Sequence, residues 1–164
     1  MNTLNIGCSY QYLENAVNID INPEVNPDKV VDLEKKLPFK DNEFDEIIGT
    51  EVIEHIKNTH GLMKELRRIL KPNGEIILTV PFHAWFKNVI TALVPKYWDF
   101  HYNPNGDHVR FFSEQSFRYI FRHNGFKVTK FLYSGKYKFL SETMTIHAIN
   151  NKRKLNENKS KTRN

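Results

Sequence analysis

The sequence predicts a single-domain α/β protein with a doubly wound, mostly parallel sheet and an antiparallel closing strand. Near-continuous apolar runs of strand length, such as 75–80, alternate with an amphipathic helical segment at 62–70. Two further strand-like runs, 126–133 and 143–149, follow each other near the carboxyl end, and Ser134-Gly135 starts their connection. We therefore expect strand, helix and strand to repeat first, and an antiparallel pair to close the sheet.

Length and composition favour one soluble globular domain. The chain has 164 residues, 40% of them hydrophobic and 26% charged, with a formal net charge of +5. The charge is concentrated near the end, because 150–164 is rich in Lys and Arg, whereas the rest of the chain is close to neutral. A uniformly basic nucleic-acid-binding face is therefore not indicated. The sequence shows no signal peptide and no membrane-length apolar run, and the single cysteine, Cys8, excludes an intramolecular disulfide, so we expect a cytoplasmic protein.

The first half of the chain reads as strands joined by short connections. An apolar run at 4–6 reaches Gly7, and a second run ends at Asp20, followed by a loop with two prolines at 21–27. Residues 29–33 form a short strand-like run, 44–50 a buried strand, and 51–56 the start of a short helix. After the helix at 62–70, Lys71 and Pro72 favour a helix end and Asn73-Gly74 a turn.

The second half opens with an irregular aromatic segment. We expect a helix near 84–94 and, over about 82–112, a lid that closes over the same edge of the sheet. Ser113 is placed to cap a helix whose apolar face holds Phe117, Ile120 and Phe121, and which ends at Asn124-Gly125. The domain is expected to span 1–149, and the polar, basic tail 150–164 to be disordered.

Small and acidic residues recur where the predicted strands end. They are Gly7-Cys8-Ser9, Asp20, Asp32 and Thr50-Glu51. Carboxyl ends of parallel strands meet at one edge of an open sheet, where ligands bind, and an acid there can accept hydrogen bonds from a ribose diol. The sequence therefore predicts a site for an adenosine-like ligand.

With these strand ends in place, residues 4–149 resemble a class I S-adenosylmethionine-dependent methyltransferase. The resemblance is to the compact, methyltransferase type 11-like branch, with a shortened first loop leading to Asn18-Ile19-Asp20. It implies a Rossmann-like fold and S-adenosylmethionine as cofactor. It also implies that Gly7, Cys8 and Ser9 approach the methionine part, that Asp20 binds the ribose, that Asp32 and Leu33 meet the adenine, and that Thr50 and Glu51 border the sulfonium.

Two departures from the family pattern concern the first loop. Ser9 stands where the family usually has glycine, and serine resists a positive φ. The first connection is also too short for a normal helix, which weakens the helix-dipole contribution expected there. The first loop is therefore the least typical part of the predicted cofactor site.

Methyl transfer needs alignment and exclusion of water, and an oxygen acceptor also gains from a base. His55 is the first candidate for that base and His83 the second, with a surface histidine as the alternative for His55. Glu54 is expected to be a solvated helix carboxylate. His108, Arg110 and Trp98 are candidate acceptor-binding residues, although surface ion pairs with Asp99 or Asp107 remain open for His108 and Arg110. We expect no metal site.

The leading hypothesis is methyl transfer to a small-molecule, sugar or lipid-like acceptor, at oxygen. A nucleic-acid methyltransferase that uses the basic tail as a phosphate tether is the alternative, but the 44–50 strand leads into Gly49-Thr50-Glu51 and not into the Asn/Asp-Pro-Pro-aromatic turn typical of methylation on base amino groups. A third hypothesis is a non-catalytic binding module that keeps the fold and has lost the cofactor.

Overall fold

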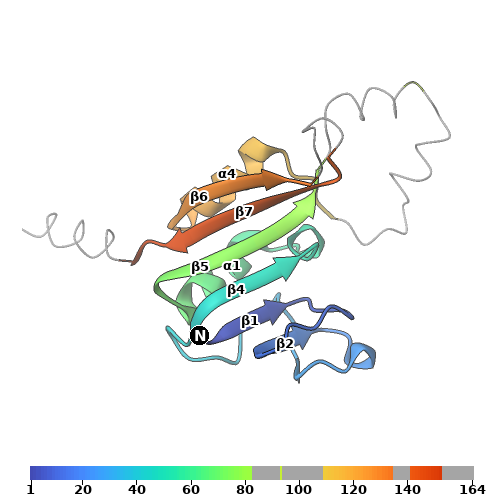
Figure 1. The fold of residues 1–164 in the computed structure, drawn as a ribbon, viewed down its shortest axis with the longest axis vertical. Helices are drawn as coiled ribbons and strands as arrows, with labels where there is room; N and C mark the ends of the chain where they lie inside the picture. The colour runs from blue at the N-terminus through green and yellow to red at the C-terminus, as the bar shows by residue number, and fades with distance from the viewer. Residues whose placement is uncertain (83–92, 94–108, 135–140, 153–164) are drawn as a thin grey trace, which may run out of the picture.

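The computed structural model describes residues 1–82, 93, 109–134 and 141–152, and these residues form one seven-stranded sheet with helices packed on it (Figure 1). The strand order is β3-β2-β1-β4-β5-β7-β6. The strands up to β5 pair in parallel, while β7 pairs antiparallel with both β5 and β6. The predicted α/β fold class, with a mostly parallel sheet closed by an antiparallel strand, is confirmed.

The parallel half of the sheet is built from short strands. They are β1 (Thr3–Ile6), β2 (Ala16–Asp20), β3 (Lys29–Val30) and β4 (Phe44–Thr50), with a one-turn 3₁₀ helix η1 (Pro23–Val25) between β2 and β3. Because β1 pairs with β2 on one side and with β4 on the other, the strand order reverses between β1 and β4. Ligands of open α/β sheets bind at such a reversal, beyond the carboxyl ends of the strands.

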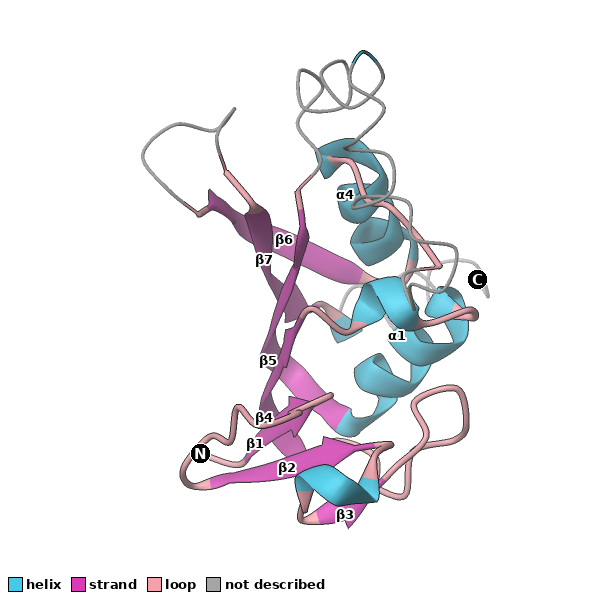
Figure 2. Ribbon diagram, turned by 90° about the vertical axis from the view of Figure 1, so that its right-hand side faces the viewer, coloured by secondary structure: helices cyan, strands magenta, loops and turns pink. Residues whose placement is uncertain are grey.

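Two amphipathic helices cover one face of the sheet (Figure 2). Helix α1 (Thr59–Ile69) follows the 3₁₀ helix η2 (Ile53–His55), and helix α4 (Glu114–His123) precedes β6 (Phe126–Tyr133). The apolar faces of α1 and α4 bury Leu62, Leu66, Ile69, Phe117 and Phe121 in the same core as the strand residues Ile47, Leu78 and Ile146. The sequence predicted these helical faces, and burial of such side chains is the main favourable term in folding.

The other face of the sheet has no described α-helix. The nine residues between β1 and β2, 7–15, form no helix, because a parallel connection that includes one needs a dozen residues or more. Side chains on this face are half-buried and partly polar. Thr79 and Thr145 hydroxyls lie 3.0 Å apart, and His147 Nδ1 lies 2.9 Å from Glu75 Oε1. The helix predicted near 84–94 lies outside the described residues except for residue 93.

Several boundaries differ from the sequence expectation. In the run at 29–33 only the two residues of β3 form a strand. The segment 51–56, expected to start a short helix, contains the single 3₁₀ turn η2. Strand β5 (Leu70–Pro81) begins directly after α1, so the Asn73-Gly74 turn becomes an irregularity within the strand, opposite Phe44 and Glu46 of β4. The predicted ends of α4 are confirmed: Ser113 is its N-cap and Asn124 its C-cap.

The last strand of the sheet ends one residue beyond the expected domain end at 149. Strand β7 (Thr143–Asn150) includes Asn150, which is fully buried and donates from Nδ2 to the carbonyls of Arg67 and Leu70 at 3.1 and 2.8 Å. Lys152 Nζ also donates to the carbonyls of Arg68 and Leu70. The fold therefore extends at least to Lys152, because these side chains bind the carbonyls that α1 leaves unpaired at its end. Residues 153–164 of the predicted tail lie outside the described residues.

Candidate active site

A pocket of about 510 Å³ lies where β1, β2 and β4 end. Its size is within the range of small-ligand pockets. Seven of the residues predicted from the sequence line it together: Gly7, Ser9, Asp20, Asp32, Leu33, Glu51 and His55. Ile21, Asn22, Val25, Glu34, Val52 and Ile56 complete the lining. The switch point of the sheet is therefore a cavity, as the strand ends predicted.

Gly7 directly follows β1 and lies in the left-handed region, with φ +61°. A Cβ at this position would lie 2.4 Å from Cγ2 of Val52, which is far inside van der Waals contact. Glycine is therefore required twice, by the backbone conformation and by the close approach of the β4–η2 turn. This packing brings the ends of β1 and β4 together beneath the pocket.

The Asp20 carboxylate is held by two backbone amides. Its Oδ2 accepts from Ser9 N at 2.8 Å and its Oδ1 from Asn22 N at 2.9 Å. Each carboxylate oxygen can accept a second hydrogen bond, so Asp20 keeps capacity to bind a ligand diol. Ser9 takes the positive φ that its side chain disfavours, +45°. The hydrogen bond to Asp20 therefore holds the first loop in the conformation that glycine would adopt more easily.

A pair of buried asparagines supports this helix-free loop. Asn5 Nδ2 donates to Asn18 Oδ1 at 2.9 Å and to the carbonyl of Gln11 at 2.8 Å. Asn18 Oδ1 also accepts from Leu13 N, and Asn18 Nδ2 donates to the carbonyl of Leu13 and to Asp28. These bonds satisfy backbone groups that a crossover helix would have paired internally.

The second acidic wall comes from the β3–β4 connection. Asp32 Oδ1 accepts from Glu34 N at 2.9 Å, and this bond, followed by the contact with Lys35, lowers the pKa of Asp32. Glu34 in turn accepts from Lys57 N and Asn58 N, just before α1. The carboxylate of Glu34 thus ties the two sides of the pocket together.

Two carboxylates follow β4, the half-buried Glu51 and the buried Glu54. Glu51 has φ +52° and donates its backbone N–H to the carbonyl of Thr79. Burial raises the pKa of both Glu51 and Glu54 to about 7, and for Glu54 the neighbouring Glu51 adds to the effect. Three of their carboxylate oxygens have no hydrogen-bond partner within the described part of the chain. They are Oε1 of Glu51 and both Oε1 and Oε2 of Glu54.

Comparison with known proteins gives this site a context. The sequence model of a family described as "Methyltransferase domain" matches residues 4–130. A methyltransferase of Haloferax volcanii, solved in complex with the Trm112 methyltransferase activator, superposes with a TM-score of 0.69 at 17% identity, over 91% of this chain and 81% of that chain. A SAM-dependent methyltransferase of Methanosarcina mazei gives 0.67 at 16% identity, over 90% and 91%.

Curated relatives match shorter stretches. Sterol 24-C-methyltransferase ERG6B of Gibberella zeae is 44% identical over 39 residues, 24% of this chain and 10% of that protein. Probable polyketide synthase 10 of Dictyostelium discoideum is 34% identical over 73 residues, 43% of this chain and 3% of that protein. The chain thus spans less than a fifth of the length of these relatives.

The family model covers well over half of the chain, including β1 to β5 and α4. The chain belongs to this methyltransferase family. Its fold is that of S-adenosylmethionine-dependent methyltransferases, and S-adenosylmethionine is the cofactor that the family and the fold imply.

The pocket suits such a cofactor both by its position at the switch point of the sheet and by its charge. Four of its lining residues are acids, namely Asp20, Asp32, Glu34 and Glu51, whereas none of its described lining residues is Lys or Arg. Glu51 lines the pocket, and a cationic ligand beside it would favour the charged form of its carboxylate. A ligand that carries a sulfonium and an ammonium group therefore matches the acidic lining of the pocket.

Other predicted residues lie apart from this cavity. Cys8 is buried, and burial raises the pKa of its thiol, but neither Cys8 nor the exposed Thr50 is among the lining residues. Arg110 donates to the carbonyls of Ile56 and Lys57, so its guanidinium lies beside the segment that follows His55. His83, Trp98 and His108, with most of the predicted lid, lie outside the described residues.

The expectation for Glu54 was wrong. Its side chain is not solvated, because only 1% of the residue is exposed. In the sequence Glu54 lies between Ile53 and His55, with charged residues three positions away on either side, and this short stretch has no helical period that would assign Glu54 to a buried face. Its burial follows from the single turn η2, which directs Ile53 and Glu54 into the protein.

Two features are absent from the described residues. They contain no group of three or more His, Cys, Asp or Glu side chains arranged to hold a metal ion. They also contain no helix that is both long enough and apolar enough to cross a membrane.

Proposed function

We propose that the chain transfers the methyl group of S-adenosylmethionine to an oxygen atom of a small-molecule, sugar or lipid-like acceptor. The observation that carries this proposal is the acidic pocket at the β1/β4 switch point, with Asp20 anchored at the end of β2 and Glu51 at the end of β4. Bound S-adenosylmethionine would supply an electrophilic methyl group on a positively charged sulfur.

Each wall of the pocket has a proposed part in binding. The free acceptor capacity of Asp20 suits the ribose hydroxyls, and Asp32 with Leu33 suits the adenine, where the carboxylate can accept from the amino group. Gly7 and Ser9 allow the first loop to approach the methionine part closely. Glu51 complements positive charge near the end of β4.

His55 is the proposed general base. It lines the same pocket and belongs to η2, directly after the strand end that holds Glu51. An imidazole there would accept the proton that an acceptor hydroxyl loses as its oxygen bonds to the methyl carbon. A contact between Arg110 and the acceptor is also proposed, and its support is that Arg110 donates to the carbonyls of Ile56 and Lys57, which follow His55. The assignments of His83, Trp98 and His108 stay predictions.

Calorimetric titration with S-adenosylmethionine tests the cofactor site. We expect Asp20→Asn to weaken binding by about tenfold or more, because the amide replaces one acceptor oxygen and removes the negative charge. Glu24→Gln is the matched control, since Glu24 is an exposed acid on η1 that does not line the pocket. Equal affinity in wild type and Asp20→Asn, or no binding at millimolar ligand, would overturn the assignment.

Transfer of a radiolabelled methyl group to a panel of hydroxylated acceptors tests the chemistry. His55→Gln is expected to lower turnover by about 10²-fold or more while leaving the affinity for S-adenosylmethionine within about twofold. Turnover equal to wild type would remove His55 from the reaction. Binding of S-adenosylmethionine without transfer to any acceptor would favour the non-catalytic module instead.

A further inference from the structure

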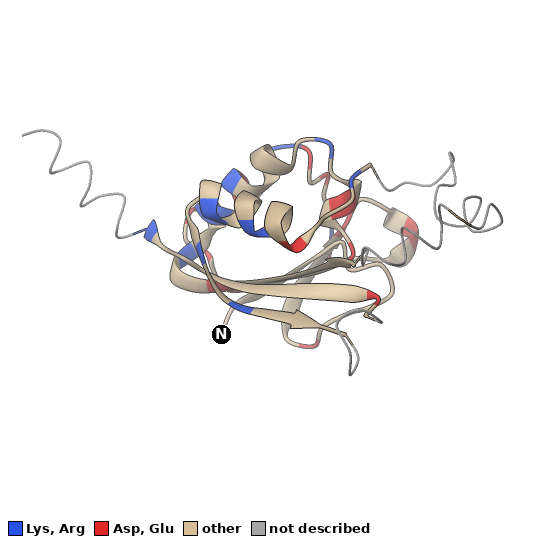
Figure 3. Ribbon diagram, turned by 90° about the horizontal axis from the view of Figure 1, so that it is seen from above, with Lys and Arg blue, Asp and Glu red and all other residues tan. Residues whose placement is uncertain are grey.

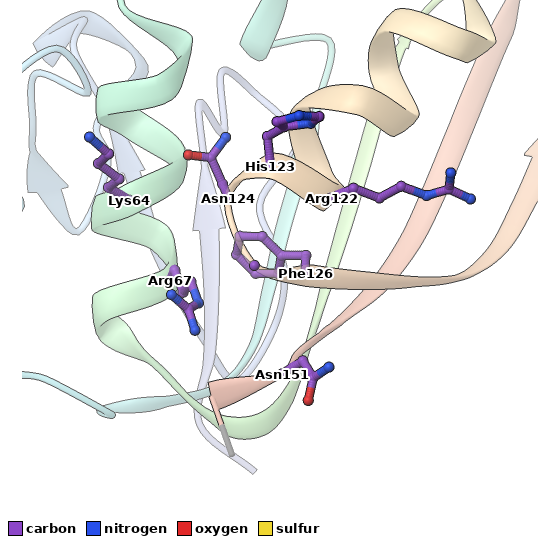
Figure 4. A pocket seen from close by; sticks show the side chains of 8 residues that line it. Lys64, Arg67, Arg122, His123, Asn124, Phe126 and Asn151 are labelled. Carbon is purple, nitrogen blue, oxygen red and sulfur yellow. The ribbon is translucent and has the colours of Figure 1, made fainter. Parts of the chain in front are cut away.

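A second pocket, also of about 510 Å³, lies at the far end of the sheet from the candidate active site. It is formed where α1 and α4 end, where β6 begins and where the chain leaves β7, as Figure 4 shows. These are the amino ends of β4 and β5, whereas the candidate active site lies at their carboxyl ends. The lining residues are Lys64, Arg67, Arg122, His123, Asn124, Gly125, Phe126 and Asn151.

The charge of this pocket is of one sign. Lys64, Arg67 and Arg122 line it, and none of its described lining residues is Asp or Glu. Figure 3 shows Lys and Arg positions gathered on the two helices and beside the end of β7. The other two arginines of α1 and α4 have acidic partners: Arg68 pairs with Asp41 and Glu65, and Arg118 with Glu114. The cations of the pocket have no such ion pair in the described part of the chain.

Arg67 is built into the wall of this pocket. Its Nε is buried without a hydrogen-bond partner among the described residues, and burial lowers the pKa of the guanidinium. Gly125, with φ +82°, makes room for it, because a Cβ there would lie 2.7 Å from both Cζ and Nε of Arg67. A buried charged donor without an acceptor is costly, so the arrangement favours a ligand that brings negative charge.

Capping of the helix does not account for Arg67. The carbonyls of Arg67, Arg68 and Leu70 at the end of α1 already accept from Asn150 and Lys152. The carboxyl ends of α1 and α4 each contribute about half a negative charge. The side chains of Lys64, Arg67 and Arg122 carry three positive charges, so roughly two unit charges remain uncompensated. The pocket therefore keeps a net positive potential.

We propose that this pocket binds a phosphate monoester group, as carried by a small phosphorylated molecule or a lipid head group. Guanidinium and ammonium donors recognise phosphate oxygens, and the side chain of Asn151 lines the same cavity. The ligand is distinct from the methyl acceptor, since the two pockets lie at opposite ends of the strands. The site would be an accessory one that recruits or regulates the enzyme.

Calorimetric titration of the full chain with inorganic phosphate, at constant ionic strength, tests the site. We expect one saturable site per chain, weakened about tenfold by Arg67→Gln and about threefold to tenfold by Lys64→Gln or Arg122→Gln. Lys64 and Arg122 are exposed, so those variants are expected to fold. Lys130→Gln, an exposed lysine of β6 outside the pocket, makes the same charge change and is expected to stay within twofold of wild type.

Two probes distinguish a small phosphorylated molecule from a lipid head group as the source of the phosphate. Glycerol 3-phosphate in solution reports a small phosphorylated molecule, and sedimentation with vesicles that contain phosphatidic acid reports a lipid head group.

The proposal is overturned if phosphate shows no saturable binding, if the three pocket variants bind as wild type does, or if Lys130→Gln weakens binding equally. Binding of a single-stranded oligonucleotide without binding of phosphate would also overturn it. The affinity for S-adenosylmethionine is expected to be unchanged in all four variants, which separates this test from that of the proposed function.

Discussion

Single residues of the candidate active site combine backbone strain with buried charge. Ser9 and Glu51 both take a positive φ, and both line the cofactor pocket. Left-handed backbone costs a non-glycine residue about 1–2 kcal/mol. These conformations persist because Ser9 N donates to Asp20 and Glu51 N to Thr79. Strain of this kind is typical of sites where loops are held ready for a ligand.

Ser9→Gly is expected to stabilise the protein. Glycine removes the steric cost of φ +45°, although the more flexible unfolded chain offsets part of the gain, so the free energy of unfolding should rise by about 0.5–1 kcal/mol. Urea denaturation measures it. Ser9→Ala keeps the Cβ and serves as control, with no gain expected, and an equal gain in both variants would show that strain at this residue is not relieved.

Glu54 links stability to pH. Its pKa is about 7 in the folded protein and takes its ordinary value near 4.5 when the chain unfolds. Between these values the folded state binds more protons than the unfolded state, so the stability contributed by Glu54 falls as pH rises from about 4.5 to about 7 and is level above that. Glu54→Gln removes this loss.

We therefore expect Glu54→Gln to be more stable than wild type by on the order of 1–3 kcal/mol at pH 8 and by much less at pH 5. Thermal unfolding across this range is the measurement. Glu24→Gln, at an exposed position, is expected to follow the wild-type profile. A difference that shrinks with rising pH would contradict the assigned sign.

Among the elements, the connection from β1 to β2 departs most from what a parallel sheet usually contains. Its nine residues are held by the Asn5–Asn18 pair in place of a helix. Asn18→Ala leaves the amide of Leu13 without an acceptor and removes one of the two acceptors of Asn5 Nδ2, and is expected to lower the free energy of unfolding by about 2–4 kcal/mol. Chemical denaturation is the measurement. Gln11 lies in the same loop and contributes only backbone groups, its carbonyl to Asn5 and its N–H to Cys8, so Gln11→Ala should change stability by less than about 0.5 kcal/mol.

Elements with strong local signals were predictable from the sequence. The apolar face and the Ser113 cap of α4 place that helix within its observed bounds, and the alternating pattern places β6 and β7. The extent of β3 was not predictable. The apolar run predicts a strand over 29–33, but only Lys29 and Val30 pair with β2. The turn at Asn73-Gly74 was identified, but its place inside β5 depends on pairing with β4, which is a tertiary effect.

The candidate site was predictable at the strand ends and not between them. Gly7, Asp20 and Glu51 follow apolar runs whose carboxyl ends meet at one edge of a parallel sheet, so topology alone brings them together. The burial of Glu54 and the contribution of Glu34 depend on how a single turn and a loop fold back, for which the sequence carries no periodic signal. The basic pocket likewise joins residues from both halves of the chain.

At the scale of the whole molecule, the fold is closed by its carboxyl-terminal residues. A chain that ends at Lys152 is expected to melt at the wild-type temperature. A chain that ends at Ile149 loses the bonds from Asn150 and Lys152 to the end of α1, and its Tm should fall by roughly 5–10 °C. Differential scanning calorimetry compares the two chains with wild type. Equal melting of the two shortened chains would show that these bonds contribute nothing.

The sheet of the described residues ends in β6, which pairs only with β7. An unpaired strand edge of eight residues offers its backbone groups to any other extended chain, including a second copy of this protein. Lys127 and Lys130 are exposed along β6, and the register shifts between Val128 and Lys130. Charge and irregularity at this edge oppose strand addition, so the lysines of β6 act against aggregation as well as contributing to the positive charge of the chain.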